Sequence, residues 1–183
     1  MLWAKRLARA YYGERPAFNY WNGCSTGGRQ GYLLAQELGT ELDGIVANAP
    51  AMYWTRFQTA QMWGQIAMLQ GTGGPIAPAK LAQAQASAIA ACDAADGIVD
   101  GIIDEPRACR FSAHANVCGA PTAPAANCLT PVEADAIDLI WDGPRNQRGH
   151  RVWFGLDRGT DFSILDGTTP FPLGAIQCRP DTG

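Results

Sequence analysis

The sequence predicts an α/β fold that continues into a helical, loop-rich region, and three observations indicate this. Between residues 18 and 50 a short aromatic strand, an amphipathic helix and an apolar strand follow one another, as in a parallel βαβ unit. After Pro50 the pattern changes to helical stretches and then to turn-rich chain. Five of the six cysteines lie in this second part. We therefore expect a partial α/β core over residues 1–52 and a second domain over residues 53–183.

Composition and charge limit the classes of partner. The 183 residues are 47% apolar and 17% charged, which is typical of a soluble globular protein with one or two domains. The net charge of −3 and the pI near 5.3 argue against a nucleic-acid partner, because no basic surface is available to neutralise phosphates. No apolar run approaches the length that crosses a bilayer, so we expect no membrane partner.

The first part contains four expected elements. Leu2, Trp3, Leu7 and Ala10 recur at helical spacing before Gly13, which predicts an amphipathic N-terminal helix. The stretch "FNYWN" predicts a strand, and "GGRQGYLLAQEL" predicts a helix. The stretch "DGIVANAP" predicts a second strand, apolar enough to be buried on both faces.

The second part contains three expected helices. They cover "MYWTRFQTAQMWGQIAMLQ" at residues 52–70, "PAKLAQAQASAIAAC" at residues 78–92, and "TPVEADAIDLIWDG" at residues 130–143. In the last of these, Thr130 is the expected N-cap, Pro131 takes the first helical position, and Glu133 completes a capping box.

The pentapeptide "GCSTG" at residues 23–27 fits the Gly-x-Ser-x-Gly pattern of a nucleophile elbow. In such an elbow the chain turns sharply from a strand into a helix and exposes the serine, here Ser25, in a strained backbone conformation. We expect Gly23 and Gly27 to be required because a Cβ at either position would collide with the neighbouring strand or helix. The alternative is a glycine-rich turn with an idle serine. Phosphate-loop and dinucleotide fingerprints do not fit.

The residues around this motif resemble the tannase and feruloyl esterase family. The stretches "YWNGCSTGGRQG", "AQ" and "LDGIVANAPA" carry the resemblance, which is dense from Phe18 to Ala51 and looser to Phe162. It implies a partial α/β-hydrolase core followed by a lid domain. It also implies Ser25 as the nucleophile and the Thr26 backbone N–H as an oxyanion donor.

The resemblance further implies that the catalytic machinery is incomplete in this chain. In the family, the cysteine before the nucleophile is bonded to a cysteine beside the catalytic histidine, so Cys24 is expected to pair with a cysteine outside this chain. The catalytic Asp and His are expected in segments beyond it, which makes the sequence an internal fragment. The two histidines present, His114 and His150, have no neighbouring cysteine and are expected at the surface.

The stretch "CDAADGIVDGIIDEP", residues 92–106, crowds four carboxylates between glycines. Calcium suits such a loop because it is a hard ion that binds carboxylate and carbonyl oxygens. The alternative is a pair of exposed Asp-Gly turns, and the EF-hand spacing does not fit. The resemblance implies a structural calcium ion held by the side chains of Asp93, Asp96 and Asp100 and the carbonyls of Ile98 and Ile102. Asp104 lies outside this set.

The cysteines indicate disulfides and an oxidising compartment, with buried free thiols as the alternative. The resemblance implies the pairs Cys92–Cys109 and Cys118–Cys128 and leaves Cys178 without an evident partner. It also makes Trp153, Phe154, Phe162, Arg151 and Arg158 candidates for contacting an aromatic acyl group. The alternative is that these aromatic residues form a small core of their own.

Two functions are compatible with these features. The first is a secreted or periplasmic carboxylic ester hydrolase that acts on aromatic esters, feruloyl, galloyl or related, through a serine acyl-enzyme. The second is a non-catalytic, calcium-stabilised extracellular binding domain. A cytosolic α/β protein with free thiols is a third possibility. The acyl specificity and the oligomeric state are not encoded in any pattern of this sequence.

Overall fold

The computed structural model describes residues 2–162 and 165. The chain divides into two compact units, with the division between Trp54 and Thr55. The helices and strands of the first unit are α1 (Leu2–Tyr12), β1 (Tyr20–Cys24), α2 (Thr26–Leu38) and β2 (Gly44–Asn48), with α3 (Trp54–Gln61) beginning at its last residue. Those of the second are α4 (Trp63–Thr72), α5 (Pro78–Cys92) and α6 (Pro131–Asp142).

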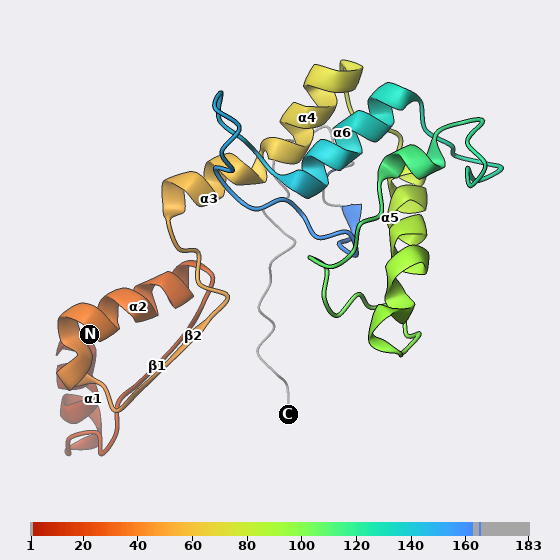
Figure 1. Cartoon of the computed structure of the whole chain (residues 1–183). Helices are drawn as coiled ribbons and strands as arrows, with labels where there is room; N and C mark the ends of the chain where they lie inside the picture. The colour runs from red at the N-terminus through yellow and green to blue at the C-terminus, as the bar shows by residue number, and fades with distance from the viewer. Residues whose placement is uncertain (1, 163–164, 166–183) are drawn as a thin grey trace. The chain divides into compact units, whose positions relative to one another are not determined.

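The first unit is built on a parallel pair of strands joined by a helix. Tyr20 pairs with Gly44 and Cys24 pairs with Asn48, so both strands end at the same edge of the sheet. Helix α2 runs alongside them and packs on the pair, as Figure 1 shows. The predicted βαβ unit is therefore present, with the first strand shifted by two residues toward the serine.

The expectation that the second strand is buried on both faces is wrong for this chain. Ile45 and Ala47 face α2, where their side chains lie against Gly31. Val46, which points to the opposite face, is 52% exposed. The sheet of the described residues has two strands, covered by α2 on one face only, so only alternate side chains of β2 are shielded.

The predicted helix over residues 52–70 is two helices, α3 and α4. They meet at Met62, whose N–H donates to the Thr59 carbonyl three residues earlier instead of continuing the α-helical pattern. Helix α4 begins at the next residue, and there the Trp63 indole donates to the Leu139 carbonyl of α6 at 2.8 Å. A tertiary contact that the local sequence does not encode therefore accompanies the break.

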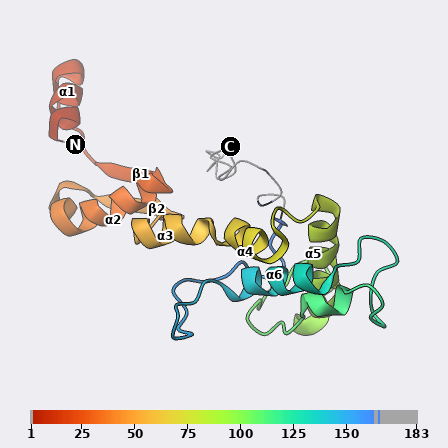
Figure 2. The ribbon, with the colours of Figure 1, turned by 90° about the horizontal axis from the view of Figure 1, so that it is seen from above.

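The core of the second unit lies between its helices. Helices α4 and α6 run side by side in both Figure 1 and Figure 2. Their contact is close because small residues face each other: a Cβ on Gly71 would lie 3.4 Å from the Ala136 Cβ. The largest fully buried side chains belong to this unit, namely Met68, Leu81, Leu129, Ile137, Ile140 and Phe162. No helix among the described residues is long and apolar enough to span a membrane.

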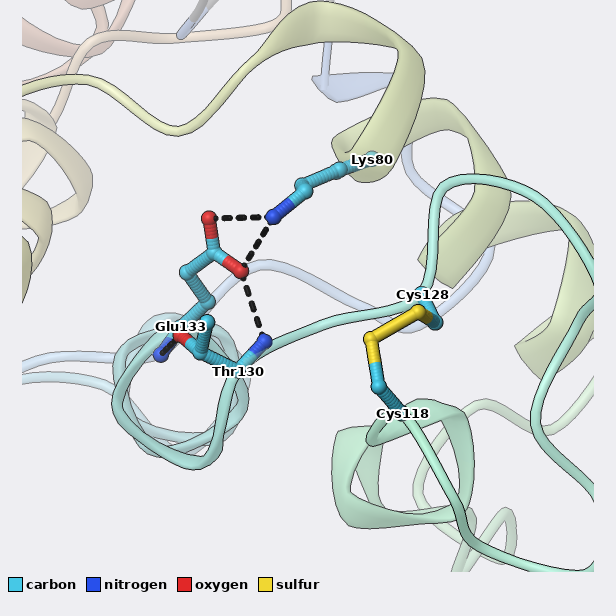
Figure 3. Close-up of a disulfide and its surroundings, with 5 residues drawn as sticks. All are labelled: Lys80, Cys118, Cys128, Thr130 and Glu133. Carbon is cyan, nitrogen blue, oxygen red and sulfur yellow. Dashed lines mark hydrogen bonds and ion pairs between the residues drawn. A yellow bond between two sulfur atoms is a disulfide. The ribbon is translucent and has the colours of Figure 1, made fainter.

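The predicted capping box is confirmed, and it also carries an ion pair (Figure 3). The Thr130 hydroxyl accepts from the Glu133 N–H, and the Glu133 carboxylate accepts from the Thr130 N–H at 2.7 Å. The same carboxylate accepts from the Lys80 ammonium of α5 at 2.7 and 2.8 Å. Partial burial raises the pKa of Glu133, but the hydrogen bonds from Lys80 and Thr130 and the Lys80 charge outweigh it, so the pKa lies below its ordinary value.

We predict that Glu133→Gln lowers the free energy of unfolding by about 1–2 kcal/mol at neutral pH, because glutamine keeps the cap but loses the charged partner of Lys80. A lowered folded-state pKa gives stability that is present above the ordinary value of 4.5 and is lost as the pH falls through the folded-state pKa. The difference between the variant and the wild type should therefore shrink in acid, as measured by urea unfolding at several pH values. Thr130→Ala is the control: it should cost about 1 kcal/mol, and this cost should change less with pH than that of E133Q, because Lys80 keeps its charged partner. An E133Q deficit that persists unchanged in acid would contradict the prediction.

Candidate active site

Ser25 lies at an abrupt bend between β1 and α2. Its backbone has φ 59° and ψ −114°, a positive φ that a non-glycine residue rarely adopts. Strand β1 ends at Cys24 and helix α2 begins at Thr26, so one residue makes the whole turn. The Ser25 side chain is half-buried. This is the backbone geometry that the nucleophile-elbow motif predicts.

Three main-chain hydrogen bonds hold this bend. The Ser25 N–H donates to the Asn48 carbonyl at the end of β2, at 3.1 Å. The Ser25 carbonyl accepts from the Arg29 N–H at 3.0 Å and from the Ala51 N–H at 3.1 Å. The bend is therefore bonded on one side to its own helix and on the other to the segment that follows β2.

Gly23 permits α2 to lie directly on β1. A Cβ there would lie 2.4 Å from the Gly27 carbonyl oxygen and 2.7 Å from the Trp21 Nε1. The Trp21 indole N–H donates to the same Gly27 carbonyl at 3.0 Å, so it lies in the space that a side chain at position 23 would need. The predicted requirement for glycine at position 23 thus has its cause in contact with the first turn of the helix.

The predicted requirement for glycine at position 27 is wrong in the described chain, where the constrained glycine is Gly28. A Cβ on Gly27 would meet no heavy atom within 4 Å outside the helix backbone. A Cβ on Gly28 would lie 2.4 Å from the Asn48 carbonyl oxygen and 3.0 Å from the Pro50 Cα. Because Gly28 has no side chain, α2 can pack closely on the end of β2. The Asn48 carbonyl, which accepts from the Ser25 N–H, has room there for the same reason.

The first turn of α2 supplies positive potential beside Ser25. Thr26 is the first residue of the helix, and the leading N–H groups of a helix carry its partial positive charge. One turn later the Arg29 guanidinium stacks over the Trp54 ring, 4.5 Å from its centroid. The arrangement is suited to stabilising an oxygen anion formed at Ser25.

The two histidines belong to the second unit and both are exposed there. His114 lies in the 3₁₀ turn Ala113–Asn116, and its Nε2 is 2.8 Å from an Asp135 carboxylate oxygen. The backbone N–H of His150 donates to the Asn146 side chain. The first unit contains no histidine.

The acidic loop folds on itself through its own carboxylates. Asp93 is buried, and its two oxygens accept from the Gly101 N–H at 3.1 Å each. Asp96 accepts from the Ile98 N–H and Asp100 from the Ile102 N–H, which makes two Asx turns. The glycines that follow Asp96 and Asp100 take the left-handed conformation that these turns need.

The residues of this loop fit calcium in chemistry but do not converge on one point. Carboxylate and carbonyl oxygens are the donors that calcium takes. Among the described residues, however, no group of three His, Cys, Asp or Glu side chains lies close enough together to hold a metal ion. Ile98 and Ile102, whose carbonyls complete the expected ligand set, are both exposed.

The cysteines that the structure describes are all oxidised. Cys92 is bonded to Cys109 and Cys118 to Cys128, the two pairs expected from the resemblance (Figure 3 shows the second). Cys24 is not a free cysteine either. Its expected pairing with a cysteine outside this chain stays a prediction, and Cys178 lies outside the described residues.

The aromatic and basic candidates of the second unit have internal partners. Phe162 is 1% exposed and stacks on Trp141 with the ring centroids 5.8 Å apart, so it is part of the core. Arg158 lies over the same Trp141 ring and donates to the Phe111 carbonyl. Phe154, another of the side chains expected to contact an acyl group, is 64% exposed. Its ring packs edge-on against the Trp153 ring.

Arg151 is held by a charge cluster at the end of α6. It donates to the Asp142 carboxylate at 2.8 Å, and Arg145 donates to the same carboxylate. The Arg145 hydrogen bond, the largest cause, and the bond from Arg151 hold the pKa of Asp142 at about 2. The Asp142 carboxylate is therefore ionised at all ordinary pH values, and the guanidinium of Arg151 already has an anionic partner.

Comparison with known proteins identifies the family. The family profile described as tannase and feruloyl esterase matches residues 1–173. The chain belongs to the tannase and feruloyl esterase family. An esterase of Xanthomonas campestris pv. campestris described as uncharacterized is 36% identical over 84% of this chain. A probable feruloyl esterase of Arthroderma benhamiae is 33% identical over 96% of this chain.

Solved structures of the family have the same fold over most of this chain. The crystal structure of feruloyl esterase B from Aspergillus oryzae covers 93% of the chain with a TM-score of 0.75 and 27% identity. The chain corresponds to 35% of that structure, and to 26% and 34% of the lengths of the two curated relatives. It therefore spans about a quarter to a third of the length of these relatives.

Sequence reasoning missed three parts of the site in this family member: Gly28, the Trp21 indole and the Ala51 N–H. The second glycine of "GGRQG" was a visible signal for a close approach, but the motif placed the requirement one residue earlier. The hydrogen bonds of Trp21 and Ala51 carry no sequence signal, because they depend on how the helix and the chain after β2 pack around the bend.

We predict opposite effects for two alanine substitutions at adjacent glycines. Gly28→Ala should lower the free energy of unfolding by about 1–3 kcal/mol, because its Cβ would overlap the Asn48 carbonyl oxygen. Gly27→Ala should be neutral or stabilising by up to about 1 kcal/mol, because alanine favours the helix and its Cβ meets open space. Chemical unfolding of the two variants checks this, and equal destabilisation by both would contradict it.

Proposed function

We propose that the full-length protein that carries this chain is a serine carboxylesterase acting on aromatic esters, with Ser25 as its nucleophile. The observation that carries the proposal is the strained bend at Ser25 between β1 and the start of α2. Such a bend presents a hydroxyl at the head of a helix, where nearby N–H groups favour negative charge. The membership of the chain in an esterase family supports the same chemistry.

In the proposed reaction, the Ser25 oxygen attacks the ester carbonyl carbon while a general base takes the hydroxyl proton. The carbonyl oxygen becomes an anion, and the backbone N–H of Thr26 donates to it. Collapse of this intermediate expels the alcohol, which receives the proton from the base. Water then attacks the acyl-enzyme, releases the carboxylic acid and restores Ser25. The catalytic Asp and His are proposed to lie in parts of the full-length protein outside this chain.

The proposed substrate class is a small aromatic ester, feruloyl, galloyl or a related phenolic acyl group. Its support is the similarity of the chain to probable feruloyl esterases and to a tannin acyl hydrolase from Aspergillus niger. We also propose that the protein works outside the cytoplasm, in a secreted or periplasmic setting. The two disulfides of the second unit support this, because such bonds persist in oxidising compartments.

A fluorophosphonate probe tests the nucleophile. In the full-length protein we expect covalent labelling at Ser25, saturable hydrolysis of a feruloyl or galloyl ester, and loss of both in Ser25→Ala, with kcat falling by at least about a thousandfold. Peptide mass spectrometry locates the label and ester hydrolysis gives the rate. Full activity of Ser25→Ala would exclude the proposal, and an unlabelled wild type would favour a binding domain.

The isolated 183-residue chain serves as the matched control for that experiment. We expect it to show no esterase turnover, because the catalytic Asp and His are proposed to lie outside this chain and its two histidines are exposed residues of the second unit. Turnover by the isolated chain that is abolished by Ser25→Ala would show that a group within these 183 residues acts as the base.

We also propose that calcium stabilises the acidic loop by binding the side chains of Asp93, Asp96 and Asp100 and the carbonyls of Ile98 and Ile102. The support is donor chemistry and the two left-handed glycines, which allow the loop to turn its carbonyls inward. Binding would have to replace the N–H partners that the three carboxylates now have. The role is structural, and no step of the ester chemistry passes through the ion.

For calcium we predict a rise in melting temperature on adding the ion and a fall on adding a chelator. Calcium at a hundred times its dissociation constant should stabilise the fold by about 2.7 kcal/mol. Asp96→Asn and Asp100→Asn should remove this response, whereas Asp104→Asn, outside the ligand set, should keep it. Thermal melting of the three variants with and without calcium decides the matter, and an equal response in all three would contradict the ligand assignment.

A further inference from the structure

The segment that follows β2 is strained at two residues. Among the described residues, the non-glycine positions with positive φ are Ser25 (59°), Ala49 (37°), Tyr53 (48°) and Asn127 (57°). Two of these four lie in residues 49–53, and a third is the elbow serine itself. A positive φ is costly for residues with a Cβ and persists only where the surrounding structure enforces it.

The side chains of the strained residues do not explain their conformation. Ala49 is exposed, and the Tyr53 ring is 73% exposed, so neither residue gains from burial what its backbone loses. Pro50 between them fixes its own φ and restricts Ala49 further. The main-chain hydrogen bonds of residues 49–53 must therefore offset the cost of the strained conformations.

Those bonds lead to Ser25. The carbonyl of Asn48, the residue before Ala49, accepts from the Ser25 N–H, and the N–H of Ala51 donates to the Ser25 carbonyl. A three-residue turn, closed by the Met52 N–H on the Pro50 carbonyl at 2.8 Å, keeps Ala51 pointing back toward the bend. Ala51 is 2% exposed, so its bond to Ser25 is shielded from water.

We infer that residues 49–53 form a positioning strap, which holds the reactive backbone conformation of Ser25 through the Ala51 N–H, together with the Asn48 carbonyl at the end of β2. The strap touches no reacting atom; it acts through the main chain of the nucleophile. Strain at Ala49 is the consequence of turning the chain back directly after the end of β2, and Tyr53 is strained where the strap passes into α3. This inference rests on the proposed function, because it assigns a purpose to the geometry of Ser25 in that reaction.

Ala49→Gly tests the strap, with Asn127→Gly as the matched control. Glycine accepts positive φ without strain and frees the backbone, so Ala49→Gly should not lower the melting temperature of the full-length protein. It should nevertheless slow fluorophosphonate labelling of Ser25 and lower kcat by about tenfold, with KM little changed. Asn127→Gly makes the same change in the second unit and should leave the labelling rate and kcat as in the wild type.

Hydrogen exchange supplies a readout that does not need turnover. The amides of Ser25 and Ala51 should exchange faster in Ala49→Gly, whereas the amide of Ala134, bonded to Thr130 within α6, should not change. Unchanged exchange and labelling in Ala49→Gly, or a loss of kcat that follows a loss of melting temperature, would overturn the strap while leaving the proposed function intact. A wild-type protein that is not labelled at Ser25 would overturn the proposed function, and with it the catalytic purpose of the strap.

Discussion

The contact between the first turn of α2 and the ends of the two strands is the constraint on which the first unit depends. It brings main chain against main chain, and it exists because Gly23 and Gly28 have no side chain to hold the elements apart. With the helix this close, the chain has a single residue in which to reverse direction, and that residue takes a conformation it would otherwise avoid. The hydrogen bonds of Ser25, the orientation of the helix N–H groups and the indole bond of Trp21 all follow from this one approach.

The second unit achieves close packing by different means. Its helices are rich in alanine, and Ala84, Ala88, Ala134 and Ala136 are almost completely buried between them. Larger side chains, among them Met68, Ile137 and Phe162, fill the rest of this core, and further links add to its stability. These links are two disulfides, the ion pair of Lys80 with Glu133, and the bond from the buried Asn116 side chain to Ser87. The loops between the helices are thus fixed covalently and by polar contacts.

The sequence predicts the local features of this chain well and the long-range ones poorly. The capping box of α6 and the bounds of α5 depend on residues within a few positions of one another. The bend at Ser25 is also marked by a local pattern, although its main-chain bonds to Asn48 and Ala51 are long-range. The choice of Gly28 over Gly27, the break at Met62 and the exposure of Val46 depend on what packs against each residue. Phe162 shows the same difference, because its burial beside Trp141 comes from a contact between residues 21 positions apart. Membership in an esterase family implied the two disulfides, which spacing alone left undetermined.

The three main-chain bonds that hold the elbow do not use the hydroxyl of Ser25. The backbone bend therefore does not require that hydroxyl for these hydrogen bonds. A thiol, a selenol or an unnatural amine could occupy the same point in space with the same surrounding scaffold. The chemistry of this position can consequently diverge, by evolution or by design, without any revision of the architecture that supports it.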